Sequence, residues 1–466
     1  MSKQRRPKLK VIISLCLAFL VYLLLCGLFI FLVHRPSIPT TNSERFFSDM
    51  VGPDRALIIE ERSSAATIRI DLIEGAKSSL RIAYYAVHDG LSSDIFYASL
   101  IEAAERGVEV ELLFDGIFHN LKGREKETYW ALVNHPNIRV KFYEIPNLFK
   151  PWTINNRLHD KFILVDDTYV LLGGRNIGDK YFLESYPGSF VEDRDVLVVN
   201  TAENLEESVL GQFKLYFEYL WSHQYTVEKD STPPQRYVEV AVSRQKGLLE
   251  KLNNLKREYP SKFNHHFDWE SLTLPTNKVT LITNPVERLN KSATILSEIA
   301  ALAETSQESL LFQSPYIIPD RHIRDYLGEE WEANLYLLTN STYSSPNYFA
   351  MAGYLKHRPQ LAKKATTLYE YYGEGTIHAK SYIFDQRISM IGSFNLDPRS
   401  AFLSTESMVV IDSIPIAKAL SDNIVELIGE SVPYSTEADT PQKTPFFKSF
   451  LIGTVRLLLY PFDPLL

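Results

Sequence analysis

The chain begins with a long apolar run and continues with apolar and polar positions that alternate in the manner of helices and strands. Residues 11–33 carry no charge over 23 positions. At about 1.5 Å per residue, a helix of this length crosses a hydrocarbon core of roughly 30 Å. The sequence therefore predicts one membrane-spanning helix ahead of the folded part.

The charges that flank this run predict its orientation. Only Arg35 and Arg45 follow it closely, whereas five basic residues precede it: Lys3, Arg5, Arg6, Lys8 and Lys10. The positive-inside rule then puts the amino terminus in the cytoplasm and the folded body across the cell membrane. A cleaved signal peptide is the alternative, but its apolar region is usually about 7 to 15 residues and ends at a small-x-small site that is not found here. Lipoprotein processing at Cys26 is a further alternative, which the large residue before it disfavours.

Two later segments share one pattern of amphipathic helix followed by apolar strand. The stretch "IRIDLIEGAKSSLRIAYYAV" corresponds to "ILSEIAALAETSQESLLFQSPYII", and "VEVELLFDG" corresponds to "ANLYLLTNS". Each half is predicted to run strand, helix, strand, helix and then paired strands, with helices packed on a sheet. The predicted fold class is therefore α/β, with two pseudo-symmetric repeats, each a mixed sheet flanked by helices, after one amino-terminal transmembrane helix.

These patterns divide the chain into seven segments. A charged and turn-rich stretch with "KDSTPPQR" and "LPTN" separates the two repeats and is interpreted as a connector. The segments are a basic cytoplasmic tail (1–10), a transmembrane anchor (11–33), a linker (34–55), the first repeat (56–225), the connector (226–275), the second repeat (276–433) and a carboxyl-terminal interfacial segment (434–466).

Composition narrows the range of functions. The formal net charge of -8 argues against a nucleic-acid partner, because such proteins usually carry a broad basic face. The two cysteines, Cys16 and Cys26, both lie in the apolar run. The folded part therefore has neither a disulfide nor a thiolate metal site.

A short motif of His, Lys and Asp occurs once in each repeat. The first copy is "RLHDKFILVD" and the second is "IHAKSYIFD". A Gly follows each His at an offset of 14 and an Asn at an offset of 17. The candidate site residues are His159, Lys161, Asp166 and Asn176 in the first repeat, and His378, Lys380, Asp385 and Asn395 in the second. Because several offsets coincide, the motif is interpreted as a duplicated functional site and not as two strands with surface lysines.

The spacing predicts how these residues are used. Side chains two apart on a strand share a face, so the His and Lys of each copy point the same way. Asp166 and Asp385 fall in predicted hairpin loops, where they hold the turn and motif geometry and take no part in proton transfer. The returning strands bring Asn176 and Asn395 back beside the His and Lys.

Two such clusters face to face suit a single phosphodiester. One His attacks phosphorus, while the other protonates the departing alkoxide and then takes a proton from the incoming hydroxyl. The lysines and asparagines hold the nonbridging oxygens as charge builds in the transition state. This scheme needs no metal or cofactor, and the sequence has no closely spaced His/Asp/Glu set of the zinc or two-metal type.

A nucleophilic His also needs its second ring nitrogen held, usually by a carboxylate. In the second half, "STESMVVI" offers Glu406 at the head of a strand. In the first half, "VEDRDVLVV" offers Asp193 and Asp195. Aligning the apolar runs that follow matches Asp195 with Glu406, so Asp195 is preferred and Asp193 is the alternative.

With both motif copies complete, the chain resembles the phospholipase D superfamily, which is marked by a duplicated H-x-K-x(4)-D motif. The similarity covers residues 56–433, and the phrases "GGRNIGD" and "NLDPRS" are most similar to bacterial cardiolipin synthases. The resemblance implies a two-repeat α/β sandwich with one active site at the seam and a covalent phosphohistidine intermediate. It also implies that His159 is the nucleophile and His378 the acid and base. Many cardiolipin synthases have two amino-terminal spans, whereas this chain has one.

The predicted function is a membrane-bound phosphatidyltransferase of the cardiolipin synthase type. The resemblance implies phospholipid substrates, phosphatidylglycerol and also phosphatidylethanolamine, at a membrane. A hydrolase that releases phosphatidic acid is the main alternative, and a membrane-tethered nuclease or an inactive scaffold is less favoured. Two features suit lipid contact. One is an apolar approach to the first motif (Leu148, Phe149, Pro151 and Trp152), for which packing in the core is the alternative. The other is a carboxyl-terminal run at 446–460 that is too short to span and either lies in the interface or covers a groove.

Overall fold

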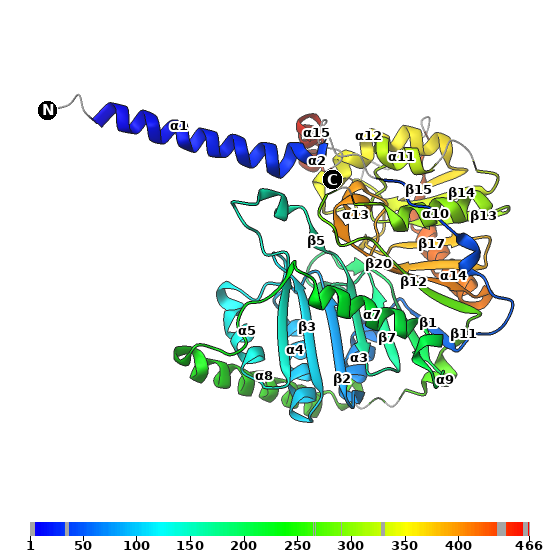
Figure 1. Ribbon diagram of the computed structural model, residues 1–466. Coiled ribbons are helices and arrows are strands. Elements are labelled where there is room, and N and C mark those ends of the chain that lie inside the picture. The colour runs from blue at the N-terminus through cyan, green and yellow to red at the C-terminus, as the bar shows by residue number, and fades with distance from the viewer. Residues whose placement is uncertain are drawn as a thin grey trace.

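The computed structural model describes residues 5–32, 37–263, 265, 267–289, 291–327, 331–435, 444–459 and 465. Two α/β halves lie side by side, and a long amino-terminal helix projects from one of them (Figure 1). Each half contains one mixed sheet with helices packed on it. The fold class predicted from the sequence is confirmed.

The first sheet has the strand order β10-β4-β3-β2-β6-β7-β9-β1-β11. Strands β2, β3 and β4 run parallel, whereas β6, β7, β9 and β1 pair antiparallel. The strands are β1 (Asp54–Ile59), β2 (Ser79–Tyr84), β3 (Glu109–Asp115), β4 (Ile138–Tyr143), β6 (Lys161–Val165), β7 (Tyr169–Gly173), β9 (Asp195–Asn200), β10 (Thr226–Glu228) and β11 (Leu274–Pro275). The main helices are α3 (Arg62–Gly75), α4 (Leu91–Glu105), α5 (Lys126–Val133), α7 (Val209–Ser222) and α8 (Val238–Glu258).

The second sheet repeats this plan, with the order β12-β20-β18-β17-β13-β14-β15-β21. Read from the other edge, each of its strands has a counterpart in the first sheet, from β21 opposite β10 to β12 opposite β1. The strands are β12 (Lys278–Thr283), β13 (Ser309–Gln313), β14 (Asn334–Asn340), β15 (Thr367–Tyr371), β17 (Ser381–Phe384), β18 (Ile388–Gly392), β20 (Ser407–Asp412) and β21 (Ser431–Pro433). The main helices are α10 (Thr294–Thr305), α11 (Arg321–Leu327), α12 (Tyr348–Lys364), α13 (Pro398–Phe402), α14 (Ile414–Gly429) and α15 (Phe446–Leu459).

A shared apolar core fixes the two sheets against each other. The central strands are buried on both faces, as in "KFILV" of β6, so each sheet must be covered on both sides. One buried cluster joins residues of both halves, with α7 packed against β12 and α14 packed against β1. Its members include Leu164, Val198 and Phe213 of the first half and Ile383, Val409 and Leu420 of the second. Removal of this apolar surface from water holds the halves in one arrangement.

Segments outside the two repeats are also built into the body. From the region expected as a connector, β10 and β11 join the first sheet, and α8 packs on α4 and α5. In the region expected as a linker, Phe46 is buried in the core of the second half, and Arg45 forms an ion pair of 2.9 Å with Glu298. The chain therefore packs against the second repeat before it forms the first strand of the first repeat.

The amino-terminal helix matches the apolar run in the sequence. It consists of α1 (Arg5–Leu24), a π-helical turn η1 (Leu25–Phe29) and α2 (Ile30–Leu32). Residues 9–32 form one helix of 24 residues with a mean hydropathy of 2.9, long and apolar enough to cross a membrane. Figure 1 shows α1 extending away from the folded body.

The two motif aspartates hold a backbone turn. Asp166 and Asp385 have φ values of 50° and 48°, in the left-handed region that Asp and Asn tolerate better than most residues. Asp166 accepts three backbone N–H bonds of 2.9 to 3.1 Å from residues 77–79, and Asp385 accepts three of 2.8 to 3.0 Å from residues 307–309. Each aspartate thus ties its hairpin to the start of the neighbouring strand, which is the role that the sequence predicts.

We expect Asp166→Ala to lower the free energy of unfolding by about 1–3 kcal/mol, because backbone donors lose their acceptor and Ala is strained at positive φ. Thermal unfolding of the full chain in detergent measures this. Asp167→Ala is the matched control, since Asp167 is exposed and forms only a surface ion pair with Lys214 and a backbone contact with Asn200. Equal melting temperatures for the two variants would contradict the turn-holding role.

Candidate active site

Two very short strand pairs cross the seam between the repeats. Strand β5 (Arg157–Leu158) runs parallel to β19 (Ser404–Thr405), and β16 (Thr376–Ile377) runs parallel to β8 (Val191–Glu192). The N–H of His159 donates to Thr405 O at 3.2 Å, and the N–H of His378 donates to Glu192 O at 2.6 Å. Each motif histidine is therefore positioned by the backbone of the opposite repeat.

The side chains also exchange partners across the seam. Nδ1 of His159 lies 2.8 and 2.9 Å from the two carboxylate oxygens of Glu406. Nδ1 of His378 lies 2.6 Å from Asp193 Oδ2. In both pairs the carboxylate holds Nδ1, so Nε2 is the nitrogen left to react.

The structure corrects the choice between the two aspartates of the first half. Asp195, preferred from the sequence, does not contact a motif histidine; its carboxylate binds Arg69 at 2.9 Å and Arg175 at 2.8 Å. Asp193, the alternative, holds His378. The reason is strand register: Gly173 pairs with Asp195, whereas the equivalent Gly392 pairs with Met408. Asp193 is therefore the counterpart of Glu406.

The two motif lysines are buried beside the histidines. Lys161 and Lys380 are each 1% exposed, and their ammonium groups donate to the backbone oxygens of His159 and His378. Burial lowers the pKa of Lys161 to about 7 and that of Lys380 to about 8, although nearby carboxylates oppose this shift. A bound anion would favour their charged forms.

Burial also lowers the pKa of both imidazoles, well below its usual value for His159 and to about 3 for His378. The neighbouring lysines add to this effect, so both rings are neutral in the free site. The two carboxylates differ. Burial raises the pKa of Glu406 to about 8, whereas His378 and Lys380 overcome burial and hold the pKa of Asp193 below its usual range.

Both histidines line one cavity of about 690 Å³. Asn176 and Asn395 line it too, and the buried Oδ1 atom of each has no hydrogen-bond partner among the described residues. Buried amide groups are rarely left unpaired, so these two are suited to a ligand. The structure thus brings together the His, Lys and Asn of both copies, while Asp166 and Asp385 remain at their turns.

Sequence reasoning missed several residues of this site. The Tyr85 ring packs edge-on against the His159 imidazole, with 4.7 Å between centroids, and Arg399 lines the cavity. Asp160, directly after His159, accepts from Tyr216 of α7 and from Thr405 of the other repeat. Arg399 lies within the "NLDPRS" phrase, so the sequence could have indicated it as a site residue. Tyr85 and Asp160 belong to no such phrase, and the sequence alone does not single them out.

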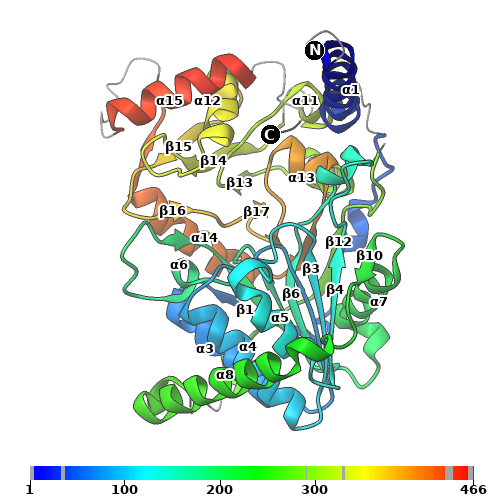
Figure 2. The same cartoon turned by 90° about the vertical axis from the view of Figure 1, so that its left-hand side faces the viewer.

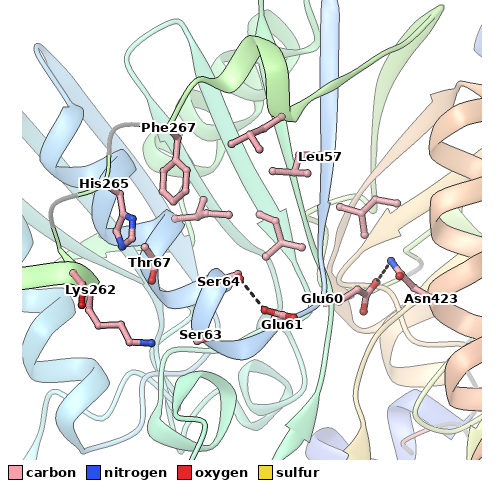
Figure 3. A pocket seen from close by; sticks show the side chains of 15 residues that line it. Leu57, Glu60, Glu61, Ser63, Ser64, Thr67, Lys262, His265, Phe267 and Asn423 are labelled. Atoms are coloured by element: carbon pink, nitrogen blue, oxygen red, sulfur yellow. Dashed lines mark hydrogen bonds between the residues drawn. The ribbon is translucent and has the colours of Figure 1, made fainter. Parts of the chain in front are cut away.

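A second cavity of about 700 Å³ lies between α3, the end of the connector and α14 (Figure 3). Its lining includes Glu60, which accepts a hydrogen bond of 3.2 Å from Asn423, and His265 beside Phe267. None of the duplicated motif residues lines it. Paired imidazoles with buried lysines occur at the first cavity, which is therefore the candidate active site.

Comparison with known proteins agrees with this geometry. The family model "Cardiolipin synthase, PLD-like domain" matches residues 69–221 and 299–428, more than half of the chain. Each matched stretch contains one copy of the motif. The chain belongs to this family. It is an enzyme of the phospholipase D superfamily, of the cardiolipin synthase type, as the motif resemblance implies.

Individual relatives support the assignment. Cardiolipin synthase C of Escherichia coli is 26% identical over 416 residues, which cover 79% of this chain and 83% of the relative. Cardiolipin synthase 2 of Staphylococcus epidermidis is 22% identical over 76% of this chain and 64% of its own length. The crystal structure of a phosphatidylserine synthase from Haemophilus influenzae has the same fold, with a TM-score of 0.61, 14% identity, and coverage of 91% of this chain and 99% of that one.

We expect Asp193→Asn to lower turnover by about 10³-fold or more, because His378 loses the anion that orients it and stabilises its protonated form. Gly174→Ala should also lower turnover, since a side chain at Gly174 collides with the Asp193 carboxylate. Gly247→Ala is the matched control, because nothing lies near an added methyl group there. Turnover of a soluble phosphodiester measures all three variants. Wild-type rates for Asp193→Asn would contradict this arrangement.

The lysine pKa values predict how anion binding depends on pH. Sulfate keeps its charge near neutrality, and its affinity should fall at least about tenfold between about pH 6 and about pH 9, because Lys161 and Lys380 lose their protons as pH rises through their pKa values of about 7 and about 8. Isothermal titration calorimetry measures this. Lys161→Ala should flatten the profile, whereas exchange of the exposed Lys278 to Ala should leave it unchanged.

Proposed function

We propose that the enzyme transfers a phosphatidyl group between phospholipids by way of a covalent phosphohistidine, as a cardiolipin synthase. One observation carries the proposal: two imidazoles from separate repeats line one cavity, each beside a buried lysine and each held by a carboxylate of the opposite repeat. Division of nucleophile and acid between two residues suits displacement at a phosphodiester.

In the first half-reaction, Nε2 of His159 attacks phosphorus and forms the P–N bond. The P–O bond to the leaving alcohol breaks, and His378, protonated from solvent at Nε2 when the anionic substrate binds, gives that proton to the departing oxygen. Negative charge on the phosphoryl oxygens is held by Lys161 and Lys380, and by the Nδ2 groups of Asn176 and Asn395, while the unpaired Oδ1 atoms can accept from a hydroxyl of the substrate. The phosphatidyl group is then attached to His159.

In the second half-reaction, the neutral His378 takes the proton of the acceptor hydroxyl. The acceptor oxygen attacks phosphorus, the P–N bond breaks, and His159 is released in its original form. With phosphatidylglycerol as acceptor, the product is cardiolipin. With water, the same step gives phosphatidic acid, so transfer requires that the lipid acceptor outcompete water.

The asymmetry of the two carboxylates supports this order of roles. Asp193 remains an anion and so stabilises His378 when that ring carries the proton of a general acid. Burial raises the pKa of Glu406, so Glu406 stabilises a protonated His159 less than Asp193 stabilises a protonated His378, and burial and Lys161 further disfavour a proton on His159. A neutral imidazole is the form that attacks phosphorus. The negative phosphodiester then raises the proton affinity of His378 as it binds.

The names of the relatives support lipids as substrates, since they are cardiolipin synthases and a phosphatidylserine synthase. The apolar helix at residues 9–32 supports a membrane location. The basic residues before this helix favour a cytoplasmic amino terminus and a body on the opposite side. We propose phosphatidylglycerol as acceptor, with phosphatidylglycerol or phosphatidylethanolamine as donor.

We expect the purified full chain in vesicles of phosphatidylglycerol, with or without phosphatidylethanolamine, to make cardiolipin, as detected by mass spectrometry. His159→Ala and His378→Ala should each lower the rate by about 10²–10⁴-fold or more, because each removes one partner of the two-step transfer. Accumulation of phosphatidic acid without cardiolipin would favour the hydrolase instead.

A substrate with a 4-nitrophenyl leaving group separates the two histidines. Because 4-nitrophenolate departs without protonation, His378→Ala should still give one burst of product and a phosphorylated peptide that contains His159. His159→Ala should give neither. The reverse pattern would exchange the two roles, and steady turnover by both variants would contradict a single shared site.

A further inference from the structure

The end of the amino-terminal helix packs against the loop that leads to the first motif. Asn155 Nδ2 donates to Gly27 O at 2.6 Å, and Tyr22 OH donates to Phe149 O at 2.8 Å. Gly27 is buried, and a methyl group on it would lie 3.3 Å from Pro151 Cβ. The absence of a side chain at Gly27 lets the two backbones approach. The helix is therefore docked on the body and is not joined to it by a tether alone.

This docked turn forms part of the active-site wall. Leu28, in the π-helical segment η1, lines the cavity that holds His159 and His378. Ile154 and Phe349 line the same cavity and are 44% and 58% exposed. A cavity with charged and amide groups at one place and open apolar side chains at another matches the two chemistries of a phospholipid, a phosphodiester and acyl chains.

The surface near this apolar side carries further exposed apolar residues. Phe149 is 77% exposed, and its ring lies 6.2 Å from Phe19 of α1. Helix α15 packs on α12, which begins next to Phe349, and it buries Ile452. Of its other apolar side chains, Phe446, Phe447, Phe450 and Leu457 are exposed, whereas Leu451 and Val455 are half-buried. Exposed apolar side chains on both elements suit contact with a membrane or a partner.

The directions of the helices favour the membrane. In Figure 1, α15 is seen nearly end-on, whereas in Figure 2 it lies across the view while α1 points toward the viewer. The axes of α1 and α15 therefore point in very different directions. If α1 spans the bilayer, α15 lies along its surface, as an amphipathic interfacial helix does.

We propose that Leu28, Ile154 and Phe349 form a lateral entrance through which a phospholipid reaches the site while its acyl chains remain in apolar surroundings, with the end of the membrane helix as one wall. This inference rests on the proposed function, since it presumes a lipid substrate. Moving two acyl chains from the bilayer into water is strongly unfavourable, because each exposed methylene group adds to the free-energy cost. An entrance next to the span avoids that exposure, because the headgroup moves toward the histidines while the chains stay against apolar walls.

The test compares two substrates on the full chain reconstituted in phosphatidylglycerol vesicles. One is the vesicle lipid, and the other is bis(4-nitrophenyl) phosphate, a soluble diester without acyl chains. Leu28→Asp should lower lipid turnover at least about tenfold more than it lowers diester turnover, because a charge blocks the apolar path that only the lipid needs. Leu25→Asp is the matched control: it puts the same charge on the same helix end, but Leu25 does not line the cavity.

Phe349→Asp changes another residue of the cavity lining without touching the membrane helix, and the same selective loss is expected. Unchanged lipid turnover in Leu28→Asp and Phe349→Asp would overturn the entrance. Equal loss on both substrates would also overturn it, because the damage would then lie at the catalytic groups. A wild-type enzyme that cleaves the diester but makes no lipid product would instead contradict the proposed function.

Discussion

The exchange of a histidine and a carboxylate across the seam is the contact on which the site depends. His159 is held by Glu406 and His378 by Asp193, and the strand before each histidine pairs with the strand before the opposite carboxylate. Neither repeat can complete a reactive imidazole alone. The shared core of α7, α14 and both sheets is therefore a condition for catalysis, because it fixes the register of these four short strands.

Symmetry brings the two clusters together, and small departures from it give them different roles. On one side a short Asp lies against Gly174, which has no side chain in the way. On the other side the longer Glu406 accepts from the hydroxyl of Ser393, the counterpart of Gly174. Burial favours the neutral form of Glu406, although the Ser393 hydrogen bond opposes this, whereas His378 and Lys380 favour the anion of Asp193. Two copies of one motif thus place two unlike pairs of histidine and carboxylate at one cavity.

Repetition explains how much of the fold and the site was predictable. The α/β class and the His, Lys and Asn positions were readable because equal offsets in two copies carry information that one copy lacks. The turn role of Asp166 was readable because hairpin loops have local rules. The sequence could not decide between Asp193 and Asp195. Residues two apart on a strand share a face, and the register of a strand is set by tertiary pairing. The cross-seam exchange, and the contribution of α8 to the first half, likewise depend on contacts distant in sequence.

Both ends of the chain are fastened to the same half. Phe31 from the end of the membrane helix, Phe46 from the following segment and Ile452 from α15 are buried in one apolar cluster with the core of the second repeat. The hydrophobic effect that stabilises this repeat thus also fixes the two elements most suited to lipid contact. Because the seam is rigidly joined to that repeat, the histidines keep a constant position relative to these elements. Two identical repeats alone would give a symmetric site. The helices at the two ends of the chain pack on the second repeat only, and this makes the surroundings of the site asymmetric.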